Sequence, residues 1–411
     1  DQLTSPAPMQ DRKKHIADAL NLNLQESVCH MSTGLKRRVQ ILHGMLQKSF
    51  VYLLDECSVD VDVAERKTVL ELIKEECTSG SGCCLYATHI LDGVGDWATH
   101  MMLMQDGEIV NIVKMSDICE PVETFAYRFL SRISQTSEYH SPITTEQSKL
   151  NEHMVMCPGD GASTHSFHQK GETVVLCNNL KFRDLFDGLS FEVYRGDRVV
   201  LCGCNGVGKT TLLNMMGGIQ YFDNSEGALR IHGKVCYEDM SLNGFVTLAG
   251  NWWAQPPPCE IYVHQMVNLA TPRAKELCEL LAVDLNWDVR HLSSGEQKRV
   301  QLLLHLQEER SVVLVDEATS NLDLDMRYAL MSFLYSESVT RGVTIIYVTH
   351  IFDGLESWPT AVMMLDHCGK KLHKVWRIPD GNSGGICVSM RTVVEELMRL
   401  KLMEREVNVA S

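Results

Sequence analysis

Short apolar runs alternate with longer segments of helical period along most of the chain. "RVVLCG" from Arg198, "SVVLVDE" from Ser311 and the run ending in "YVTH" at His350 are rich in β-branched residues and short enough for buried strands. "KTTLLNMMGG" from Lys209 has apolar residues at helical spacing instead. This alternation predicts an α/β fold around a mostly parallel sheet, with an antiparallel β portion near residues 172–195.

Three further segments complete the pattern. "SMRTVVEELMRLKLMERE" from Ser389 predicts a terminal helix, and "ETFAYRFLSRI" from Glu123 predicts a short amphipathic helix. "SEYHSPITTEQSKLNEH" from Ser137 is polar and has no period, which is typical of a linker. No apolar run approaches the ~20 residues that a membrane-spanning helix needs.

The chain repeats itself at a shift of 261 residues, from His30 to about Val110 and with no inserted residue. A match of this length indicates a duplication. The matching positions include glycine, acidic, histidine and tryptophan residues: His30 with His291, Gly34 with Gly295, Asp55-Glu56 with Asp316-Glu317, His89 with His350, and Trp97 with Trp358.

The duplication predicts a domain organisation. We expect the C-terminal part of a first copy at 1–115, a linker at 116–170, a complete second copy at 171–375 and an extension with a helix at 376–411. The first-copy counterpart of the glycine-rich segment at Gly203 falls before the first residue of the sequence. We therefore expect the first copy to be incomplete at its N-terminus and the chain to be a fragment or a processed product.

The glycine-rich segment is the first candidate for chemistry. It fits the pattern G-x-x-x-x-G-K-[ST] (Walker A) between an expected strand and an expected helix. Glycines let successive backbone N–H groups surround phosphate oxygens at a helix N-terminus, so an accidental glycine-rich turn is the weaker interpretation. Lys209 can reach β- and γ-phosphates, and the Thr210 hydroxyl can bind Mg²⁺. The predicted phosphate-binding residues are Gly203, Cys204, Asn205, Gly206, Val207, Gly208, Lys209, Thr210 and Thr211.

Two acids and a histidine follow two of the expected strands. Asp316, at the end of its strand, can orient Mg²⁺ through water, and Glu317 can act as a general base or polarise the attacking water. His350 can contact the γ-phosphate and hold that water together with Glu317. A solvated acidic pair is the alternative, but it does not explain the later strand that ends in His350.

The start of an expected helix occurs in both copies. In "LSSGEQKRVQ", Ser293 resembles an N-cap residue, Gly295 leaves room for a phosphate, and Glu296 follows at the helix start. The first copy reads Ser32-Thr33-Gly34-Leu35 at this place. An ordinary capped helix is the alternative interpretation. The position of this segment, 21 residues before Asp316, favours the functional interpretation instead.

The composition narrows the class of protein. The net charge of −15 argues against a general nucleic-acid binder, although Lys36-Arg37-Arg38 is a local basic patch. The 15 cysteines are scattered without zinc-finger spacing, so we expect reduced thiols and a cytoplasmic or nuclear location. The sequence starts without a charged and then apolar leader, so secretion is not expected.

These motifs, in this order, resemble the nucleotide-binding domain of ABC ATPases. The resemblance covers residues 171–372 fully and 1–115 as the C-terminal part of a second such domain. "YVTHIFDGLESWPT" and "YATHILDGVGDWATH" resemble, within that superfamily, the soluble ABC proteins associated with the Ccr–Not transcription and mRNA-decay complex and their plant relatives. The fold implied is a P-loop NTPase of ABC type in two copies, the first truncated.

The resemblance implies how two copies act together. In ABC proteins ATP lies between the loop of one domain and the signature helix of the other. Gly203–Thr211, Asp316, Glu317 and His350 would then work with Ser32 and Gly34, and Leu35 should weaken that site modestly. Ser293 and Gly295 would complete a second site, whose hydrolytic residues Asp55-Glu56 and His89 are present in the first copy.

Two features depart from the ABC pattern. The glutamine that lies between loop and signature helix in this superfamily is not obvious, because "TLAGNWWAQPPP" occupies that region and Gln255 is only a candidate. Phe182 is our choice for the aromatic residue that stacks on adenine, because Asp184 occupies the other position considered.

The leading hypothesis is an ABC ATPase without a membrane domain, which binds and hydrolyses Mg-ATP to drive a switch on a macromolecular partner such as a Ccr–Not-like complex. The alternative is an ATP-binding subunit of a membrane ABC transporter. A ribosome-acting tandem factor is disfavoured because the linker lacks a charged helical hairpin. A non-hydrolysing scaffold is disfavoured by Lys209, Asp316, Glu317 and His350.

Overall fold

The computed structural model describes residues 7–31, 33–58, 61–80, 82–105, 107–134, 171–224, 226–250, 259–319, 322–366, 370–378 and 389–410. They form two compact units, Asp1–Ala126 and Tyr127–Ser411. Ser32, Gln255 and the polar segment expected to be a linker, 137–153, lie outside the described residues.

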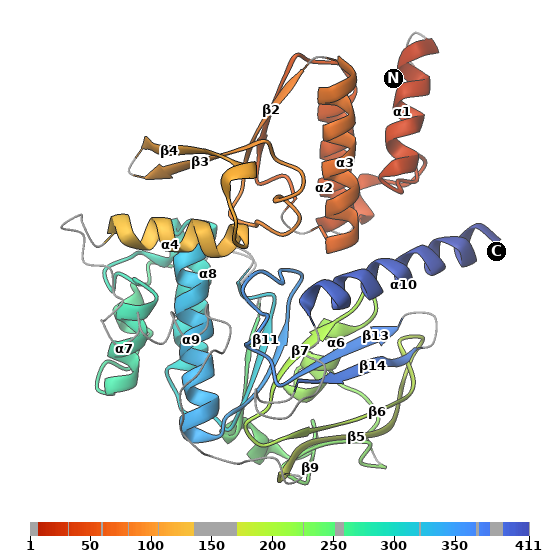
Figure 1. The fold of residues 1–411 in the computed structure, drawn as a ribbon. Helices are drawn as coiled ribbons and strands as arrows, with labels where there is room; N and C mark the ends of the chain where they lie inside the picture. The colour runs from red at the N-terminus through yellow and green to blue at the C-terminus, as the bar shows by residue number, and fades with distance from the viewer. Residues whose placement is uncertain are drawn as a thin grey trace. The chain divides into compact units, whose positions relative to one another are not determined.

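A six-stranded sheet is the centre of the second unit (Figure 1). Its order is β10-β11-β12-β7-β13-β14, and all neighbours are parallel except β13 and β14. The mostly parallel sheet expected from the sequence is thereby confirmed. The strands are β7 (Arg198–Cys202), β10 (Val246–Ala249), β11 (Val312–Asp316), β12 (Thr344–Val348), β13 (Ala361–Asp366) and β14 (Lys371–Arg377).

A second sheet in this unit is antiparallel, as expected near residues 172–195. Its order is β6-β5-β8-β9, formed by β5 (Thr173–Phe182), β6 (Phe186–Tyr194), β8 (Leu229–Ile231) and β9 (Lys234–Val235). Helices complete the unit: α6 (Lys209–Met216), α7 (Pro272–Leu280), α8 (Ser294–Leu306), α9 (Leu324–Arg341) and α10 (Met390–Ala410), with 3₁₀ turns at Met240–Gly244, Val263–Gln265 and Val289–His291.

The two faces of the six-stranded sheet bury different elements, because successive strand side chains point to opposite faces. Leu314, Ile346 and Met363 share one apolar core with α6 and the antiparallel sheet. Figure 1 shows α8 and α9 on the opposite side of the sheet. Side chains such as Val315 and Tyr347 point to that side, and both are 1 % exposed. The sheet is therefore covered on both faces, as a parallel sheet requires.

The terminal helix expected from Ser389 is present as α10. Met390, Val393, Leu397 and Leu400 are buried and lie at helical spacing along one stripe. His373 of β14 contacts Glu396 of the helix at 3.0 Å. None of the helices in the described part of the chain is long and apolar enough to cross a bilayer.

The first unit contains two pairs of strands and the helices around them. The strand pairs are β1 (Val51–Asp55) with β2 (Cys83–Ala87), which are parallel, and β3 (His100–Gln105) with β4 (Glu108–Lys114), which are antiparallel. The helices are α1 (Ala7–Ala19), α2 (Thr33–Met45) and α3 (Val63–Gly80), with 3₁₀ turns at Val28–His30 and Met115–Asp117, and the boundary between the units falls within α4 (Val122–Ser134). The short helix expected from Glu123 is α4.

The repeat predicted from the sequence holds in the structure. Raising the bounds of α2, β1, α3, β2 and β3 by 261 gives the bounds of α8, β11, α9, β12 and β13 without a one-residue change. The parallel register also repeats, since Val51 pairs with Cys83 and Val312 with Thr344.

Buried contacts repeat at the same shift and extend the duplication ahead of His30. Arg12 pairs with Glu76 at 2.7 Å and donates to the Met45 carbonyl. Arg273 likewise pairs with Glu337 at 2.8 Å and donates to the Leu306 carbonyl. The indole N–H groups of Trp97 and Trp358 also donate to equivalent carbonyls, those of Leu70 and Met331.

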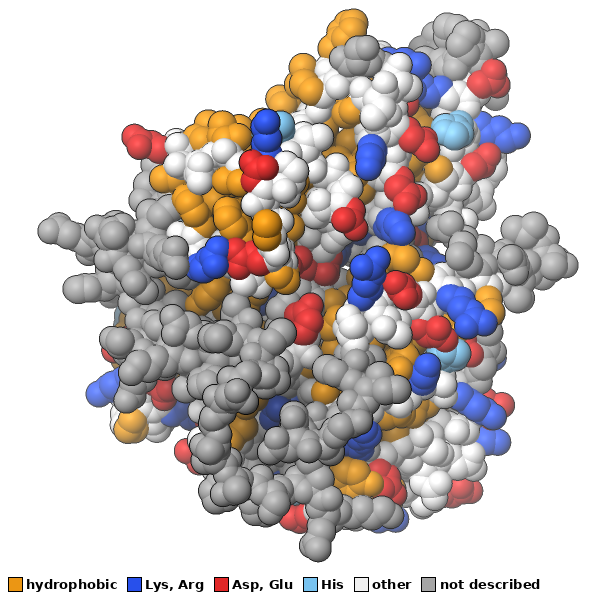
Figure 2. All heavy atoms as spheres, viewed as in Figure 1, with side chains coloured by type: hydrophobic (Ala, Val, Ile, Leu, Met, Phe, Trp, Pro, Cys, Tyr) orange, Lys and Arg blue, Asp and Glu red, His pale blue; other side chains and the backbone are white. Residues whose placement is uncertain are grey.

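One face of the first unit differs from its counterpart. Leu53, Leu85 and Met104 are 74 %, 55 % and 59 % exposed, whereas the equivalent residues Leu314, Ile346 and Leu365 are at most 2 % exposed. Hydrophobic side chains gather over the β3–β4 hairpin in Figure 2. In the second unit, α6 and the antiparallel sheet cover the equivalent residues of that unit's own strands. The described residues of the first unit include no counterpart of either.

The repeated tryptophan gives a prediction about stability. Trp358 has no exposed surface, so Trp358→Ala should lower the free energy of unfolding of the second unit by about 3–5 kcal/mol. Denaturant unfolding of the variant would measure this loss. Val339→Ala on α9 is the control, because Val339 is 60 % exposed and its truncation should change stability by less than about 0.5 kcal/mol. Equal effects of the two changes would contradict the assigned burial.

Candidate functional site

The glycine-rich segment joins the central strand β7 to α6. All five residues of β7 are buried, and the loop leaves the sheet at Gly203. Gly203, Gly206 and Gly208 have φ values of 152°, 83° and 99°, a region that favours glycine. A Cβ on Gly208 would lie 2.8 Å from Cζ of the buried Phe186, so this position also lacks room for a side chain. The strand–loop–helix context expected from the sequence is confirmed.

Lys209 is held by the loop itself. Its Nζ donates to the carbonyl oxygens of Gly203 and Cys204 at 2.8 and 2.9 Å, and the residue is only 5 % exposed. The ammonium group thus lies where the loop curves around it, which suits a group that contacts phosphate oxygens.

Asp316 lies at the end of β11 beside the start of α6. Burial raises the pKa of its carboxyl group, while a hydrogen bond with Thr210 opposes this shift. Its Oδ1 atom is buried and has no hydrogen-bond partner among the described residues. A buried carboxylate oxygen without a partner, next to the exposed Thr210, fits a bound cation or its water.

Mg²⁺ is the cation that fits these residues. In the part of the chain that the structure describes, no group of three His, Cys, Asp or Glu side chains could hold a metal ion. Mg²⁺ takes most of its ligands from water and phosphate groups and needs only one or two protein groups. Thr210 and Asp316 could supply these.

Glu317 and His350 meet where β11 and β12 end. His350 Nε2 lies 2.9 Å from Glu317 Oε1. The N–H of Glu317 donates to the Val348 carbonyl at 3.0 Å, which fixes its backbone at a φ of 47°, an uncommon value for a residue other than glycine. Burial acts to raise the pKa of Glu317, but the hydrogen bond and charge of His350, with Lys209 and Lys298, lower it overall. Glu317 is therefore ionised at neutral pH, as a general base must be.

The first unit repeats this arrangement. Glu56 has a φ of 46°, and its N–H donates to the Ala87 carbonyl at 3.0 Å. Its Oε1 lies 2.7 Å from His89, but here the ring nitrogen is Nδ1. The acid and histidine predicted for the first copy are thus brought together as well.

The two expected signature helices begin as α8 and α2. Ser293 caps α8 in a capping box: its hydroxyl accepts from the N–H of Glu296 at 3.3 Å, and Glu296 accepts from the N–H of Ser293 at 2.8 Å. Glu296 therefore has a structural role at the helix start, and its contact with nucleotide stays a prediction. Gly295 and Gly34 lie in the first turns of their helices. Pairing of Ser32 and Gly34 with the phosphate loop also stays a prediction.

Phe182 ends β5 near the phosphate loop. It is half-buried, and the Arg183 guanidinium lies 4.9 Å from its ring centroid. Leu185 follows in the same turn, and its Cβ would lie 3.7 Å from a Cβ added to Gly208. The turn that carries Phe182 therefore lies against the loop, and stacking of its ring on adenine stays a prediction.

Lys298 is a residue that the sequence patterns did not single out. It lies on α8 and is 4 % exposed. Burial lowers the pKa of its ammonium group, and the charges of Asp316 and Glu317 oppose this shift. Its first-copy counterpart Arg37 donates to the Glu56 carbonyl at 2.6 Å. The signal in the sequence that could have identified Lys298 was a basic residue at this position in both copies.

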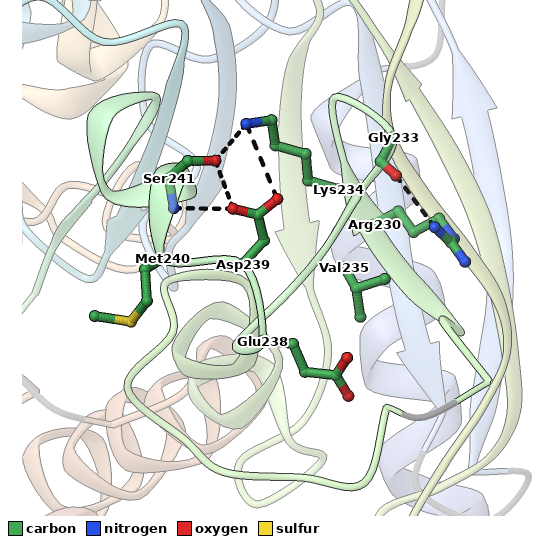
Figure 3. A pocket seen from close by; sticks show the side chains of 8 residues that line it. All are labelled: Arg230, Gly233, Lys234, Val235, Glu238, Asp239, Met240 and Ser241. Carbon is green, nitrogen blue, oxygen red and sulfur yellow. Dashed lines mark hydrogen bonds and ion pairs between the residues drawn. The ribbon is translucent and has the colours of Figure 1, made fainter.

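A hollow of about 590 Å³ lies elsewhere in the second unit, along the β8–β9 hairpin (Figure 3). Lys234 contacts Asp239 and Ser241 there, and Arg230 donates to the Gly233 carbonyl. None of the residues predicted to bind nucleotide lines it. We assign it no part in the site.

Comparison with known proteins agrees with the geometry of the loop and the paired strand ends. The model of the family described as "ABC transporter" matches residues 186–320. The second unit carries an ABC ATPase domain. "ABC transporter I family member 20" of Arabidopsis thaliana is 34 % identical over 196 residues, and "CCR4-associated factor 16" of Saccharomyces cerevisiae is 28 % identical over 207 residues.

These relatives match only part of this chain. The alignments cover 44 % of this chain in both cases, with 59 % of the plant protein and 71 % of the yeast protein. The solved structure named "RNase-L Inhibitor" covers 95 % of this chain and 72 % of its own, with a TM-score of 0.67 and 18 % identity. That likeness shows the fold, an ABC-type P-loop NTPase in two copies, as expected from the repeat.

The first prediction from the site concerns Gly208. Gly208→Ala would place a Cβ against Phe186 at a φ of 99°, and strain of about 1–3 kcal/mol should weaken ATP binding by roughly 5- to 150-fold. Calorimetric titration with ATP would measure the change. Gly218→Ala is the matched control, because Gly218 has a φ of 70° but nothing within 4 Å of its added Cβ. An affinity loss of the same size in both variants would contradict the role of the loop.

The second prediction concerns Asp316. Asp316→Asn removes the charge beside Thr210, so Mg²⁺ affinity in the presence of ATP should fall by about 10- to 100-fold. ATP binding measured with a chelator present should stay the same, because the phosphate loop is untouched. Titration of Mg²⁺ into each ATP-bound protein would measure this, and an unchanged Mg²⁺ affinity would exclude Asp316 from the cation site.

Proposed function

We propose that the second unit binds Mg-ATP at Gly203–Thr211 and hydrolyses it with Glu317 and His350. The observation that carries this proposal is the 2.9 Å contact between His350 and Glu317 at the ends of neighbouring strands. One of these strands, β12, pairs directly with β7, which leads into the loop. A base, a histidine and a phosphate-binding loop therefore lie at one edge of one sheet.

Each residue of the site has a distinct role in the proposed reaction. Ionised Glu317 accepts a proton from the attacking water or polarises it, and His350 holds Glu317 and contacts the γ-phosphate. Lys209 and the loop N–H groups neutralise the phosphate oxygens. Thr210 and Asp316 would hold Mg²⁺, which would supply further positive charge to the phosphates.

The repeat supports a switch driven by closure of two ABC copies. Ser32 and Gly34 of the first copy would contact ATP bound at Gly203–Thr211, so γ-phosphate would favour the closed pair. Joining both copies in one chain raises the effective concentration of each for the other. Ser293 and Gly295 would serve the complementary site of the first copy.

A macromolecular complex is the proposed target of this switch. The yeast relative is named as a CCR4-associated factor, which supports a Ccr–Not-like transcription or mRNA-regulation complex as the partner class. A cytoplasmic or nuclear place of action follows from such a partner. The net charge of −15 favours a protein contact over direct binding to nucleic acid.

An ATP-binding subunit of a membrane transporter is the second candidate. The matching family and the plant relative both carry the words "ABC transporter" in their descriptions. In that case the closing pair would move the helices of a separate permease.

The turnover assay tests the proposed function. Glu317→Gln and Lys209→Ala should each lower Mg-ATP hydrolysis by at least about 100-fold, because they remove the base and a phosphate contact. Glu317→Gln should still bind ATP. Glu309→Gln is the control and should keep full turnover, because Glu309 is an exposed carboxylate that pairs with Arg341. Undiminished turnover in Glu317→Gln would overturn the proposed site.

The same variant separates the two partner classes. Glu317→Gln with bound Mg-ATP should accumulate in the closed state and retain its partner during purification. Components of an mRNA-regulation complex would support the leading proposal, and a polytopic membrane protein would support the transporter subunit.

A further inference from the structure

The hydroxyl of Tyr347 connects the two segments that carry Glu317 and His350. Tyr347 lies on β12 and is 1 % exposed. Its Oη atom is hydrogen-bonded to Oγ1 of Thr319, and Tyr347 itself precedes His350 by three residues. Thr319 follows Glu317 by two residues, and Thr349 directly precedes His350. One buried hydroxyl thus joins both segments just behind the side chains that face the nucleotide site.

Thr349, between Tyr347 and His350, holds the turn that follows it. Its hydroxyl accepts from the N–H of Ile351 at 3.0 Å and lies 3.1 Å from the Ile351 carbonyl. Both threonines are nearly inaccessible, at 1 % and 2 % exposed. Water therefore cannot replace the tyrosine hydroxyl without rearrangement of the core.

The Asp-Gly-x-x-x-Trp segment holds the tyrosine ring in place. Trp358 packs edge-on against Tyr347 with the ring centroids 5.9 Å apart. Its indole N–H donates to the Met331 carbonyl of α9 at 2.9 Å, and Asp353 lies 3.8 Å from Arg327 of the same helix. This segment thus holds the tyrosine ring from behind.

The first unit contains the same cluster, which is an independent observation. Ser58 and Tyr86 share a hydrogen bond at 2.5 Å, and Tyr86 packs edge-on against Trp97, also with centroids 5.9 Å apart. Thr319 is replaced by Ser58 here, and only the hydroxyl group is common to both.

We propose that Tyr347, through its bond to Thr319, is a positioning residue that sets the distance between Glu317 and His350 for hydrolysis. This inference rests on the proposed function. Glu317 has a left-handed backbone conformation, which persists only where its surroundings determine it. Without the tyrosine hydroxyl, the turn after Glu317 loses its side-chain bond to the strand that leads to His350. The tyrosine itself does not contact nucleotide.

A double-mutant cycle tests the proposal. Tyr347→Phe and Thr319→Val each remove one side of the hydrogen bond with little change of volume. Each should lower kcat for Mg-ATP by about 10- to 100-fold, the size expected for a small misplacement of reacting groups. KM and the affinity for ATP should stay within about twofold, because the phosphate loop is unchanged. The double variant should be no slower than the slower single variant, because both changes break the same bond.

Two controls distinguish positioning from general damage. Thr319→Ser should retain kcat, since Ser58 makes the same bond in the first unit. Tyr194→Phe should also retain kcat, because it removes a hydroxyl that donates to the exposed Glu192 carboxylate, away from the strand ends.

Three results would overturn the proposal. One is an unchanged kcat in Tyr347→Phe, and another is multiplication of the two single losses in the double variant. The third is a parallel loss of ATP affinity and thermal stability that accounts for the lower rate. Glu317→Gln, assayed beside them, separates the two claims. Full turnover in Glu317→Gln would refute the proposed function and this inference together. Lost turnover in Glu317→Gln with normal activity of Tyr347→Phe would refute only the inference.

Discussion

The parallel pairing of β11 with β12 is the constraint on which the site depends. Its register places Asp316 beside Val348, so both strands end at the same level of the sheet. The acid after one strand and the histidine after the other then meet without any long loop to bring them together. Because β12 also pairs with β7, the same edge holds the phosphate loop. A shift of two residues in this register would separate Glu317 from His350 by about 7 Å.

Sequence patterns predicted the parts of the site that depend on local structure. The loop at Gly203, the strand that ends at Asp316 and the helix cap at Ser293 each follow from neighbouring residues, and the structure forms them as expected. The link from Tyr347 to Thr319 could not be predicted in this way, because it joins two strands through a buried contact. Lys298 was missed for a similar reason: its burial against the acids depends on how α8 packs.

The two copies differ at the start of α2 and α8 but share several contacts elsewhere. The first copy has Leu35 where the second has Glu296, so the capping box of α8 has no equivalent carboxylate in α2. The acid–histidine pair, the tyrosine–tryptophan cluster and the arginine–glutamate pair are nevertheless the same in both. The tyrosine–tryptophan and arginine–glutamate contacts are largely removed from solvent, where a change of one partner leaves the other without a bond, whereas the acid–histidine pairs lie at the strand ends.

The exposed apolar face of the first unit has a consequence for its dynamics. Strands β1 and β2 bury side chains on one face only, whereas β11 and β12 are covered on both. Local opening is easier where fewer apolar contacts are lost. The amide hydrogens of Leu53 and Leu85 should therefore exchange with solvent much faster than those of Leu314 and Ile346, although the four residues occupy equivalent places in one repeated ladder.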